Sequence, residues 1–295
     1  MKQMSISFFF LLIVGVNAVY SQDSETNQKD KSYFQAGIKY LSDNVYLGRK
    51  DSATVSYITP TIGYYHKSGV YITGGASYQP NNGANRIDLI TIEAGYDYSI
   101  KDKFYGGFYA GKYFYSGDSY AVNAEVNTGI GTYGSYNFGW ITANAGAGVS
   151  ISSKSDFITE AGLSKSIVDK KEKFEMVPTI KFNAGSQNYY NEYYKSGRAV
   201  NAGIANKRGR GRGSSGGTGT TTTPATTSII EAARFKIMDY EFSLPLSYTA
   251  DKFKIKFIPI YAVPVNPASI QTDQGIIKEG LSNHFFAELE LTYKF

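Results

Sequence analysis

Few side chains in this sequence could carry out covalent chemistry. There is no cysteine, which excludes a disulfide framework, a thiolate metal site and a cysteine nucleophile. Only two histidines occur, and His66 stands two residues before Ser68. An imidazole beside a hydroxyl is the minimal pairing of a general base with a nucleophile. The alternative is coincidence, because catalytic groups are recognised by their geometry and not by their spacing.

The segment His66-Lys67-Ser68 resembles the His-any-Ser spacing of the outer-membrane phospholipases, twelve-stranded barrels that use Ser with His and Asn. The resemblance implies a membrane-embedded lipid hydrolase. It falls in an expected periplasmic turn, however, whereas that chemistry needs the serine to face lipid of the outer leaflet. We therefore expect no catalytic residue and no enzyme, and keep the hydrolase as the alternative function.

No metal or cofactor site is expected. His284, the second histidine, begins the last expected strand without another imidazole nearby in the sequence, so we interpret it as a polar rim residue. Asp43 and Asp51 flank the first long loop without the regular carboxylate spacing of a calcium loop.

A larger set of ionisable side chains alternates with apolar residues and is expected on the inner face of a barrel. A mixture of both signs in a narrow bore favours salt bridges that plug and stiffen the barrel, because an unpaired buried charge costs several kcal/mol. The alternative is a narrow polar channel for small solutes. These lumen candidates are Lys39, Glu93, Asp97, Lys112, Glu125, Glu160, Glu175, Lys181, Asp239, Glu241, Lys254, Lys256, Glu288, Glu290 and Lys294.

One long loop, 185–234, has a distinctive composition. It combines a tyrosine cluster, a basic Arg-Gly stretch with Arg208, Arg210 and Arg212, and a Gly/Thr-rich tract that is expected to be partly disordered. If the loop faces outward, the arginines could bind the phosphates of lipopolysaccharide. The alternative is a solvated loop without a ligand, and the secreted address makes nucleic acid an improbable partner.

The elements that position these residues are read from period-two alternation. Residues 1–21 have the basic start, short apolar run and small residues of a secretory signal peptide, and 22–32 form a periplasmic segment. Mean hydropathy is −0.28, as expected where polar lumen residues dilute lipid-facing ones. Twelve strands are expected at 33–41, 54–65, 70–78, 87–100, 104–115, 125–137, 140–151, 157–167, 174–184, 235–248, 253–261 and 284–295.

Short and long links alternate along this series, as in barrels with tight periplasmic turns and longer extracellular loops. Tyr-rich strands, such as the one with Tyr105, Tyr109, Tyr113 and Tyr115 on one face, are expected to turn that face to lipid. Pro60, Pro178, Pro245 and Pro259 are expected to mark bulges or strand ends.

The final strand is apolar on one face, charged on the other except at Phe286, and closes on Phe295. This pattern resembles the assembly signal of Gram-negative outer-membrane β-barrels. The Tyr-rich chain also resembles uncharacterised barrel proteins of the Bacteroidota. The resemblance implies an all-β fold with residues 33–295 as a closed antiparallel transmembrane barrel, multi-pass in the outer membrane.

The function expected for such a barrel is non-enzymatic, either a narrow channel or a charge-plugged structural or partner-binding barrel. Its expected partners are outer-membrane lipids and lipopolysaccharide, the barrel-assembly machinery during insertion, and an outer-membrane protein.

Overall fold

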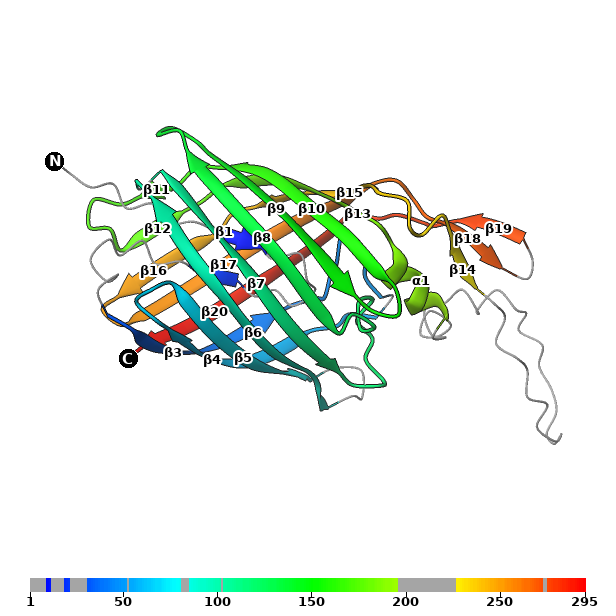
Figure 1. Ribbon diagram of the computed structural model, residues 1–295, viewed down its shortest axis with the longest axis horizontal. Helices are drawn as coiled ribbons and strands as arrows, with labels where there is room; N and C mark the ends of the chain where they lie inside the picture. Colours follow the sequence, from blue (N-terminus) through cyan, green and yellow to red (C-terminus); the bar gives the residue numbers. More distant parts are fainter. Residues whose placement is uncertain are drawn as a thin grey trace.

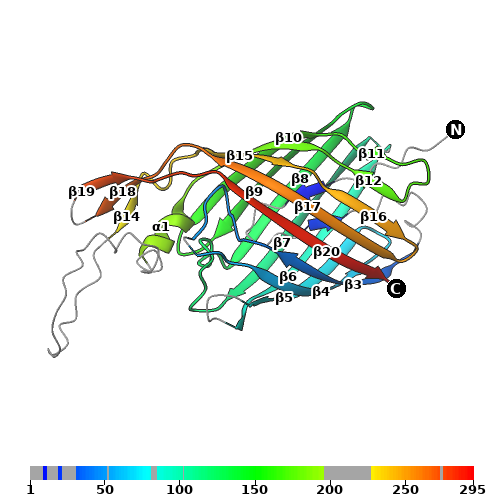
Figure 2. The ribbon, with the colours of Figure 1, turned by 180° about the vertical axis from the view of Figure 1, so that it is seen from behind.

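The computed structural model describes residues 9–11, 19–21, 31–51, 53–80, 85–101, 103–195, 227–272 and 275–295. Within these ranges the chain forms a closed antiparallel barrel of twelve strands (Figures 1 and 2), in which β20 pairs with β3 to close the wall. Among the described residues, no helix is long and apolar enough to cross a membrane.

The wall follows the order of the sequence. Its strands are β3 (Tyr33–Leu41), β4 (Tyr57–Tyr65), β5 (Val70–Gln79), β6 (Arg86–Ile100), β7 (Phe104–Tyr115), β8 (Thr128–Asn137), β9 (Thr142–Ile151), β10 (Ser155–Ser164) with its extension β11 (Ile167–Val168), β12 (Phe174–Met176) continued by β13 (Thr179–Gly185), β15 (Lys236–Ser243) continued by β16 (Leu246–Ala250), β17 (Phe253–Pro264) and β20 (His284–Lys294).

The remaining elements do not take part in this wall. In the part of the chain that the structure describes, one short helix, α1 (Asn188–Lys195), follows β13. A separate sheet of β14 (Ser228–Ile230), β18 (Ser269–Thr272) and β19 (Gly275–Lys278) projects beyond the barrel at the end opposite the C-terminus (Figure 1). Strands β1 (Phe9–Leu11) and β2 (Val19–Ser21), inside the expected signal peptide, pair with each other.

The two ends of the barrel differ as the sequence predicts. The end that carries Tyr33 and Phe295, which we call the turn end, has the short links, such as 66–69 and 138–141. The opposite loop end carries the long links, including 42–56, 116–127 and 265–283. The alternation of short and long connections is that of membrane barrels.

The outer surface of the wall is mainly apolar, with exposed lysines such as Lys112 and Lys165 near its two ends. Isoleucine, leucine and phenylalanine alternate outward along the strands, as Ile38, Ile62, Ile92, Phe182 and Leu291 illustrate. Exposed aromatic residues gather at both ends: Tyr98, Phe138, Trp140, Phe174, Phe253 and Phe295 at the turn end, and Tyr40, Tyr78, Phe114, Phe157, Tyr261 and Phe285 at the loop end. An apolar band between two aromatic belts matches a barrel that spans a bilayer.

The tyrosines of β7 correct one expectation. Tyr109 and Tyr113 are buried and face the bore, and Tyr105 and Tyr115 pack beside them, while Phe108 and its neighbours face outward. The inward tyrosines fit because glycines lie opposite, and a Cβ on Gly131 would come within 2.6 Å of the Tyr109 ring. Tyrosine lines the bore because its hydroxyl finds polar partners there, as in the Tyr133 bond to Asp97.

Two bulges turn further side chains inward near the loop end. The register between β5 and β6 shifts by one residue beside Asp88, and both Asp88 and Leu89 are buried. A second shift, between β13 and β15, buries Met238, although it alternates in the sequence with the outward-facing Tyr240 and Phe242. One extra residue in a strand reverses which face the following side chains occupy.

Prolines interrupt the wall where the sequence predicts irregularity. Pro178 separates β12 from β13, and Pro245 separates β15 from β16. Pro60 and Pro259 lie within β4 and β17, and the ladder between β4 and β5 omits the pair at Pro60.

Candidate functional site

The loop end of the bore is closed by the protein's own loops. Side chains from 42–56, 116–127, α1 and 265–283 pack together with inward side chains of the strands in one buried cluster. Val122, Tyr189 and Ala268 within it have no exposed surface. A second cluster around Ile258, Ile260 and Phe286 fills the other side of the bore. We call these two clusters together the plug.

A tight turn presents Arg49 at the centre of the plug. Tyr46 and Arg49 exchange backbone hydrogen bonds of 2.8 and 2.9 Å across Leu47 and Gly48, which both have positive φ. This is the geometry of a type I′ turn, which favours glycine. A Cβ on Gly48 would lie 2.8 Å from the Cβ of Asp239, so the glycine also allows the turn to approach the wall.

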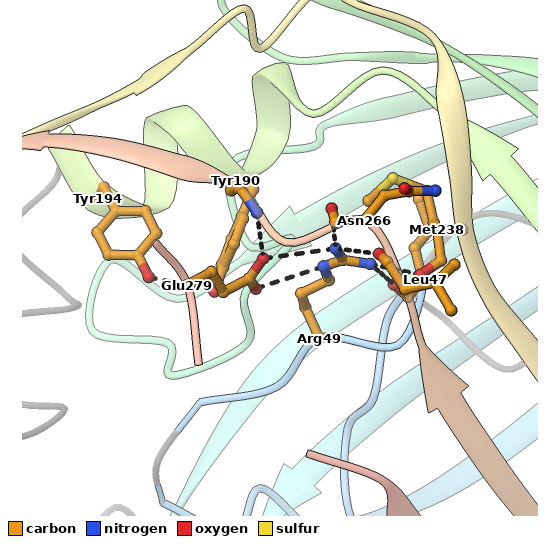
Figure 3. Close-up of polar contacts among 9 residues, drawn as sticks. Leu47, Arg49, Tyr190, Tyr194, Met238, Asn266 and Glu279 are labelled. Carbon is orange, nitrogen blue, oxygen red and sulfur yellow. Dashed lines mark hydrogen bonds and ion pairs between the residues drawn. The ribbon is translucent and has the colours of Figure 1, made fainter. Parts of the chain in front are cut away.

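Arg49 joins segments that are far apart in the sequence (Figure 3). Its guanidinium donates to the carbonyl oxygens of Met238 at 2.6 Å and Val265 at 3.0 Å, and of Leu47 and Asn266. Its Nε also lies 3.4 Å from an oxygen of Glu279, whose other oxygen accepts the backbone N–H of Ala268 at 2.8 Å. With only 2% of its surface exposed, Arg49 is a buried latch between loop 42–56, the end of β15 and loop 265–283.

Helix α1 is fixed against the rim by two carboxylates. The backbone N–H groups of Asn188 and Tyr189, at the start of the helix, each donate to Asp156 at 2.7 Å, which satisfies donors that a helix start leaves free. On the opposite side, the hydroxyl of Tyr193 donates to Asp51 of loop 42–56 at 2.6 Å. The expected tyrosine cluster of loop 185–234 is therefore part of the plug.

The tyrosines of the plug are held in their neutral form. Burial raises the pKa of Tyr46, Tyr189, Tyr190 and Tyr194, because a buried tyrosinate loses its hydration. Glu279 lies beside Tyr190 and Tyr194 (Figure 3), and its negative charge raises both pKa values further. Ionisation of these groups would therefore work against the packing of the plug.

Below the plug, the bore carries the charged residues in paired rows. Glu290 on β20 lies directly between Lys39 on β3 and Lys256 on β17 in the strand register. On the neighbouring strands, Lys181 lies 3.0 Å from Glu241 and 3.5 Å from Glu160. Opposite charges next to one another keep the mixture close to neutral within the wall.

Glu288 is the least compensated member of this set. It is fully buried, its ion pair with Lys39 is 4.0 Å long, and neither carboxylate oxygen has a hydrogen-bond partner in the described part of the chain. Polar side chains closer to the turn end, such as Gln35, Thr61 and Thr73, are only half-buried. The polar half of the bore is thus less tightly filled than the plug.

Most of the lumen candidates face the bore. The buried or half-buried, inward-facing members are Lys39, Glu93, Asp97, Glu160, Glu175, Lys181, Asp239, Glu241, Lys254, Lys256, Glu288, Glu290 and Lys294. Lys112 differs: it is exposed on the outer face of β7 near the loop end, where its ammonium donates to Asn127 and Thr128. Glu125 lies in loop 116–127, because β8 begins at Thr128.

His66 and Ser68 are adjacent in an exposed turn at the turn end. The Nδ1 of His66 lies 2.8 Å from the Ser68 hydroxyl and also accepts the backbone N–H of Ser68 at 3.2 Å. These bonds hold the turn locally, and no carboxylate or amide that would orient the imidazole contacts it in the hydrogen bonds described. Among the described residues, no group of three or more potential ligands could hold a metal ion.

Some predicted features lie outside the described residues. These are Arg208, Arg210 and Arg212 with the Gly/Thr-rich tract up to 226, and most of the expected signal peptide and periplasmic segment. Their roles stay predictions.

The sequence did not reveal the latch. Arg49 lies in a loop without a motif, and its partner Met238 is 189 residues away. The one local signal is Leu47-Gly48 before Arg49, a turn sequence in a loop that otherwise looks unremarkable.

Comparison with known proteins gives similarity of structure alone. No protein-family model and no curated protein matches the sequence. Among solved structures, a KdgM porin is similar over 88% of this chain and 99% of its own, with 8% identity and a TM-score of 0.48. A NanC porin covers 89% and 98% with 9% identity and a TM-score of 0.44. LpxR from Salmonella typhimurium covers 88% and 99% with 9% identity and a TM-score of 0.40.

Proposed function

We propose that this protein is a non-enzymatic β-barrel of the outer membrane that is closed at its extracellular end by its own loops. The apolar outer surface with an aromatic belt at each end supports the membrane location. The turn end then faces the periplasm and the loop end faces the exterior. The protein acts as a charge-stiffened structural barrel that presents its outer loops to partners.

The latch at Arg49 carries this proposal. A guanidinium that is 2% exposed and donates to carbonyl groups of three separate segments is not a mobile surface side chain. The apolar clusters around it bury side chains from four loops and the barrel wall. Opening such a plug exposes apolar surface and leaves Glu279 without its cation, so the closed form is favoured.

Electrical conductance in planar bilayers tests the closure. The wild-type protein should show no steady current. Arg49→Met keeps an unbranched side chain but removes its donors and its charge, and it leaves the Glu279 carboxylate, 6% exposed, without its cation. Because loss of one partner of a buried ion pair costs about 3–5 kcal/mol, this variant should show frequent openings.

A neighbouring cation offers the matched control. Lys50 pairs with Asp43 at the more exposed rim, with 21% of its side chain accessible, so Lys50→Met should stay closed. Arg49→Met combined with Glu279→Gln removes the uncompensated charge and should open less often than Arg49→Met alone. A steady wild-type current that none of these changes alters would overturn the proposal.

A narrow channel for small polar solutes is the second candidate. It is favoured by the half-buried polar side chains of the bore near the turn end, including Gln35 and Thr61. For this function the plug must open in the resting protein. Steady wild-type conductance of small ions with exclusion of larger solutes would support it over the closed barrel.

We also propose that the turn with His66 and Ser68 has no catalytic role. The imidazole accepts a backbone N–H within its own turn, which accounts for its position without a substrate. Purified wild-type protein and Ser68→Ala should release no fatty acid from phospholipid vesicles. Hydrolysis by the wild type that Ser68→Ala abolishes would instead support the lipid hydrolase.

The proposed orientation in the outer membrane also indicates which molecules the protein would contact. Outer-membrane lipids would contact the apolar wall, with lipopolysaccharide around the loop end, where Arg208, Arg210 and Arg212 could meet its phosphates. Insertion would depend on the barrel-assembly machinery, and a protein partner would meet the projecting sheet of β14, β18 and β19. If a variant without residues 200–222 no longer co-purifies with lipopolysaccharide, this result would support the contact between the arginines and its phosphates.

A further inference from the structure

Three prolines stand in two neighbouring rows across adjacent strands of the barrel wall. The pairs on either side of the interruptions fix the register: Ser164 pairs with Thr179, and Thr179 pairs with Ser243. On the turn side Ile167 pairs with Met176, and Met176 with Leu246. The residues between them therefore form two neighbouring rows across the wall: Lys165, Pro178, Leu244 and Pro259 in one, and Ser166, Val177, Pro245 and Ile258 in the other.

At three strand pairings in this region, only one of the two backbone hydrogen bonds of an antiparallel pair is formed. Three bonds remain: Lys165 donates to Pro178 at 3.2 Å, Val177 to Pro245 at 2.9 Å, and Leu244 to Pro259 at 3.2 Å. In an antiparallel ladder the partner residue returns a bond from its own N–H. Proline has no N–H, so all three return bonds are missing. We call this line of three weakened junctions the seam.

The seam is costly in a closed barrel. Prolines are normally confined to edge strands and bulges, and a barrel has no edge. In hydrocarbon, a carbonyl without a donor costs several kcal/mol. The seam leaves the carbonyls of Lys165, Val177 and Leu244 without their ladder donors, and the Thr179 hydroxyl replaces the donor only at Val177, at 3.0 Å. Donors from water in the bore or from polar lipid groups would stabilise the other two carbonyls.

Different chemistry lies on the two sides of the seam. Lys165 is exposed on the lipid-facing side, close to the turn end, beside the exposed Pro178. On the inner side, Ser166 donates to Glu175 at 2.6 Å, and Ser247 lies in register between Glu175 and Lys256. A cation outside and a mixed-charge polar surface inside suit a molecule with a phosphate-containing head and an apolar tail.

We propose that the seam is a lateral opening in the wall, through which the polar head of a membrane lipid passes between the bilayer and the polar half of the bore. The tail stays in the membrane, and Lys165 meets the phosphate as the head enters. The opening runs from Lys165, near the turn end, to Pro259 in the middle of β17, where it borders the plug residues Ile258 and Ile260. Entry of a lipid head near Lys165 does not require the plug to open.

The absence of cysteine from the chain makes a labelling test clean. A single cysteine at Ser247, which faces the bore next to the seam, is exposed in liposomes to a phospholipid with a maleimide on its head group. The same experiment with Thr73→Cys, which faces the bore from β5, measures entry away from the seam. A water-soluble maleimide reports access through the periplasmic mouth.

The lipid reagent should label Ser247→Cys and not Thr73→Cys, and Lys165→Gln should slow this labelling. Replacement of Pro178, Pro245 and Pro259 by valine restores three donors in residues that suit strands. These changes should lower lipid labelling by about 100-fold, which corresponds to about 1 kcal/mol for each restored bond. Labelling by the soluble reagent should not change.

Pro60→Val is the matched control, because Pro60 lies in β4, away from the seam, and its replacement should leave lipid labelling unchanged. Hydrogen exchange provides a second measurement: backbone amides of 163–181 and 242–261 should exchange faster than those of β6 and β7, and the triple valine variant should remove the difference. Equal lipid labelling at Ser247→Cys and Thr73→Cys, or labelling that persists in the triple variant, would overturn the lateral opening.

Discussion

At the scale of single residues, the hydroxyl of Tyr189 makes no hydrogen bond that would stabilise the plug among the described residues. The Tyr189 hydroxyl is fully buried and has no hydrogen-bond partner in the described part of the chain. Tyr189→Phe keeps the ring and its edge contact with Tyr46, whose centroid lies 4.7 Å away. Because an unsatisfied buried hydroxyl costs about 1–3 kcal/mol, the variant should be more stable by about 1 kcal/mol in urea unfolding from detergent micelles. A loss of stability would mean that the hydroxyl has a partner.

Alkaline pH should loosen the plug. In the unfolded chain tyrosine ionises near pH 10. Burial raises the pKa of Tyr46, Tyr189, Tyr190 and Tyr194 above this value, so the folded protein retains protons that the unfolded chain releases. Stability should therefore stay constant below about pH 10 and fall above it.

The melting temperature, measured from pH 8 to pH 12, checks this dependence. Tyr189→Phe should reduce the loss at high pH, since one titrating group is removed. Tyr98→Phe, on the outer face of β6, should melt like the wild type. A wild-type curve that stays level beyond pH 11 would contradict the buried neutral tyrosines.

At the scale of elements, β20 shows why its one irregular side chain matters. Phe286 breaks the alternation of the sequence because it faces inward among Ile258, Ile260 and Val55, with 2% of its surface exposed. Phe285 points outward and is 70% exposed. Phe286→Ala should cost about 3 kcal/mol, as large-to-small changes in a core do, while Phe285→Ala should cost less than half as much. Urea unfolding of the two variants compares them directly, and equal losses would refute the filled bore at this level.

The strands were predictable because alternation is a local property. β3 and β7 have the predicted bounds, whereas β4 and β8 begin at Tyr57 and Thr128, later than expected at 54 and 125. Val55, ahead of β4, and Val126, ahead of β8, continue the alternation but pack into the plug instead. Tertiary packing therefore decided where these strands begin.

The direction of aromatic faces was not predictable from residue type alone. β7 carries aromatic residues on both faces, and hydrophobicity does not separate them. What separates Tyr109 from Phe108 is the space that Gly131 leaves on the neighbouring strand, and Gly131 does not lie nearby in the sequence. The bulges at Asp88 and Met238 also reverse which residues face inward, and no local sequence signal predicts them.

The candidate site also has a part that the sequence predicts and a part that it does not. Charged rows such as Lys39, Glu290 and Lys256 follow from the strand register once the strands are known. The Arg49 latch depends on carbonyl groups, which every residue has, brought together from three segments. A sequence cannot distinguish such carbonyls from any others.

At the scale of the whole molecule, the two halves of the bore have different chemistry. The half at the loop end is tightly filled by the mainly apolar plug, and the half at the turn end is polar, charged and partly exposed. The seam weakens the wall beside the polar half. A molecule that reached this half from the membrane would meet ions and hydroxyls, and would find the way outward blocked by the plug. Under the two proposals, the polar heads of lipids enter the bore from the membrane on the periplasmic side, while the plug keeps the extracellular end closed.

The position of the barrel in the bilayer can be tested with the single tryptophan of the chain. Trp140 lies in the turn between β8 and β9 and is 71% exposed within the belt at the turn end. Its indole should lie at the level of the lipid head groups, because an indole combines apolar surface with a hydrogen-bond donor. Lipids brominated near the head group should therefore quench its fluorescence more than lipids brominated near the chain ends.

A tryptophan moved to mid-height provides the control for this depth. Ile92 faces outward in the middle of β6 and is 50% exposed, so the variant Trp140→Phe with Ile92→Trp should respond most strongly to bromine near the chain ends. The reversal of the two profiles would follow from a bilayer that covers the wall between its aromatic belts, because the two sites then differ in depth by about half of the roughly 25 Å apolar band. Equal quenching of both tryptophans, or none in vesicles, would place the apolar surface in contact with something other than lipid.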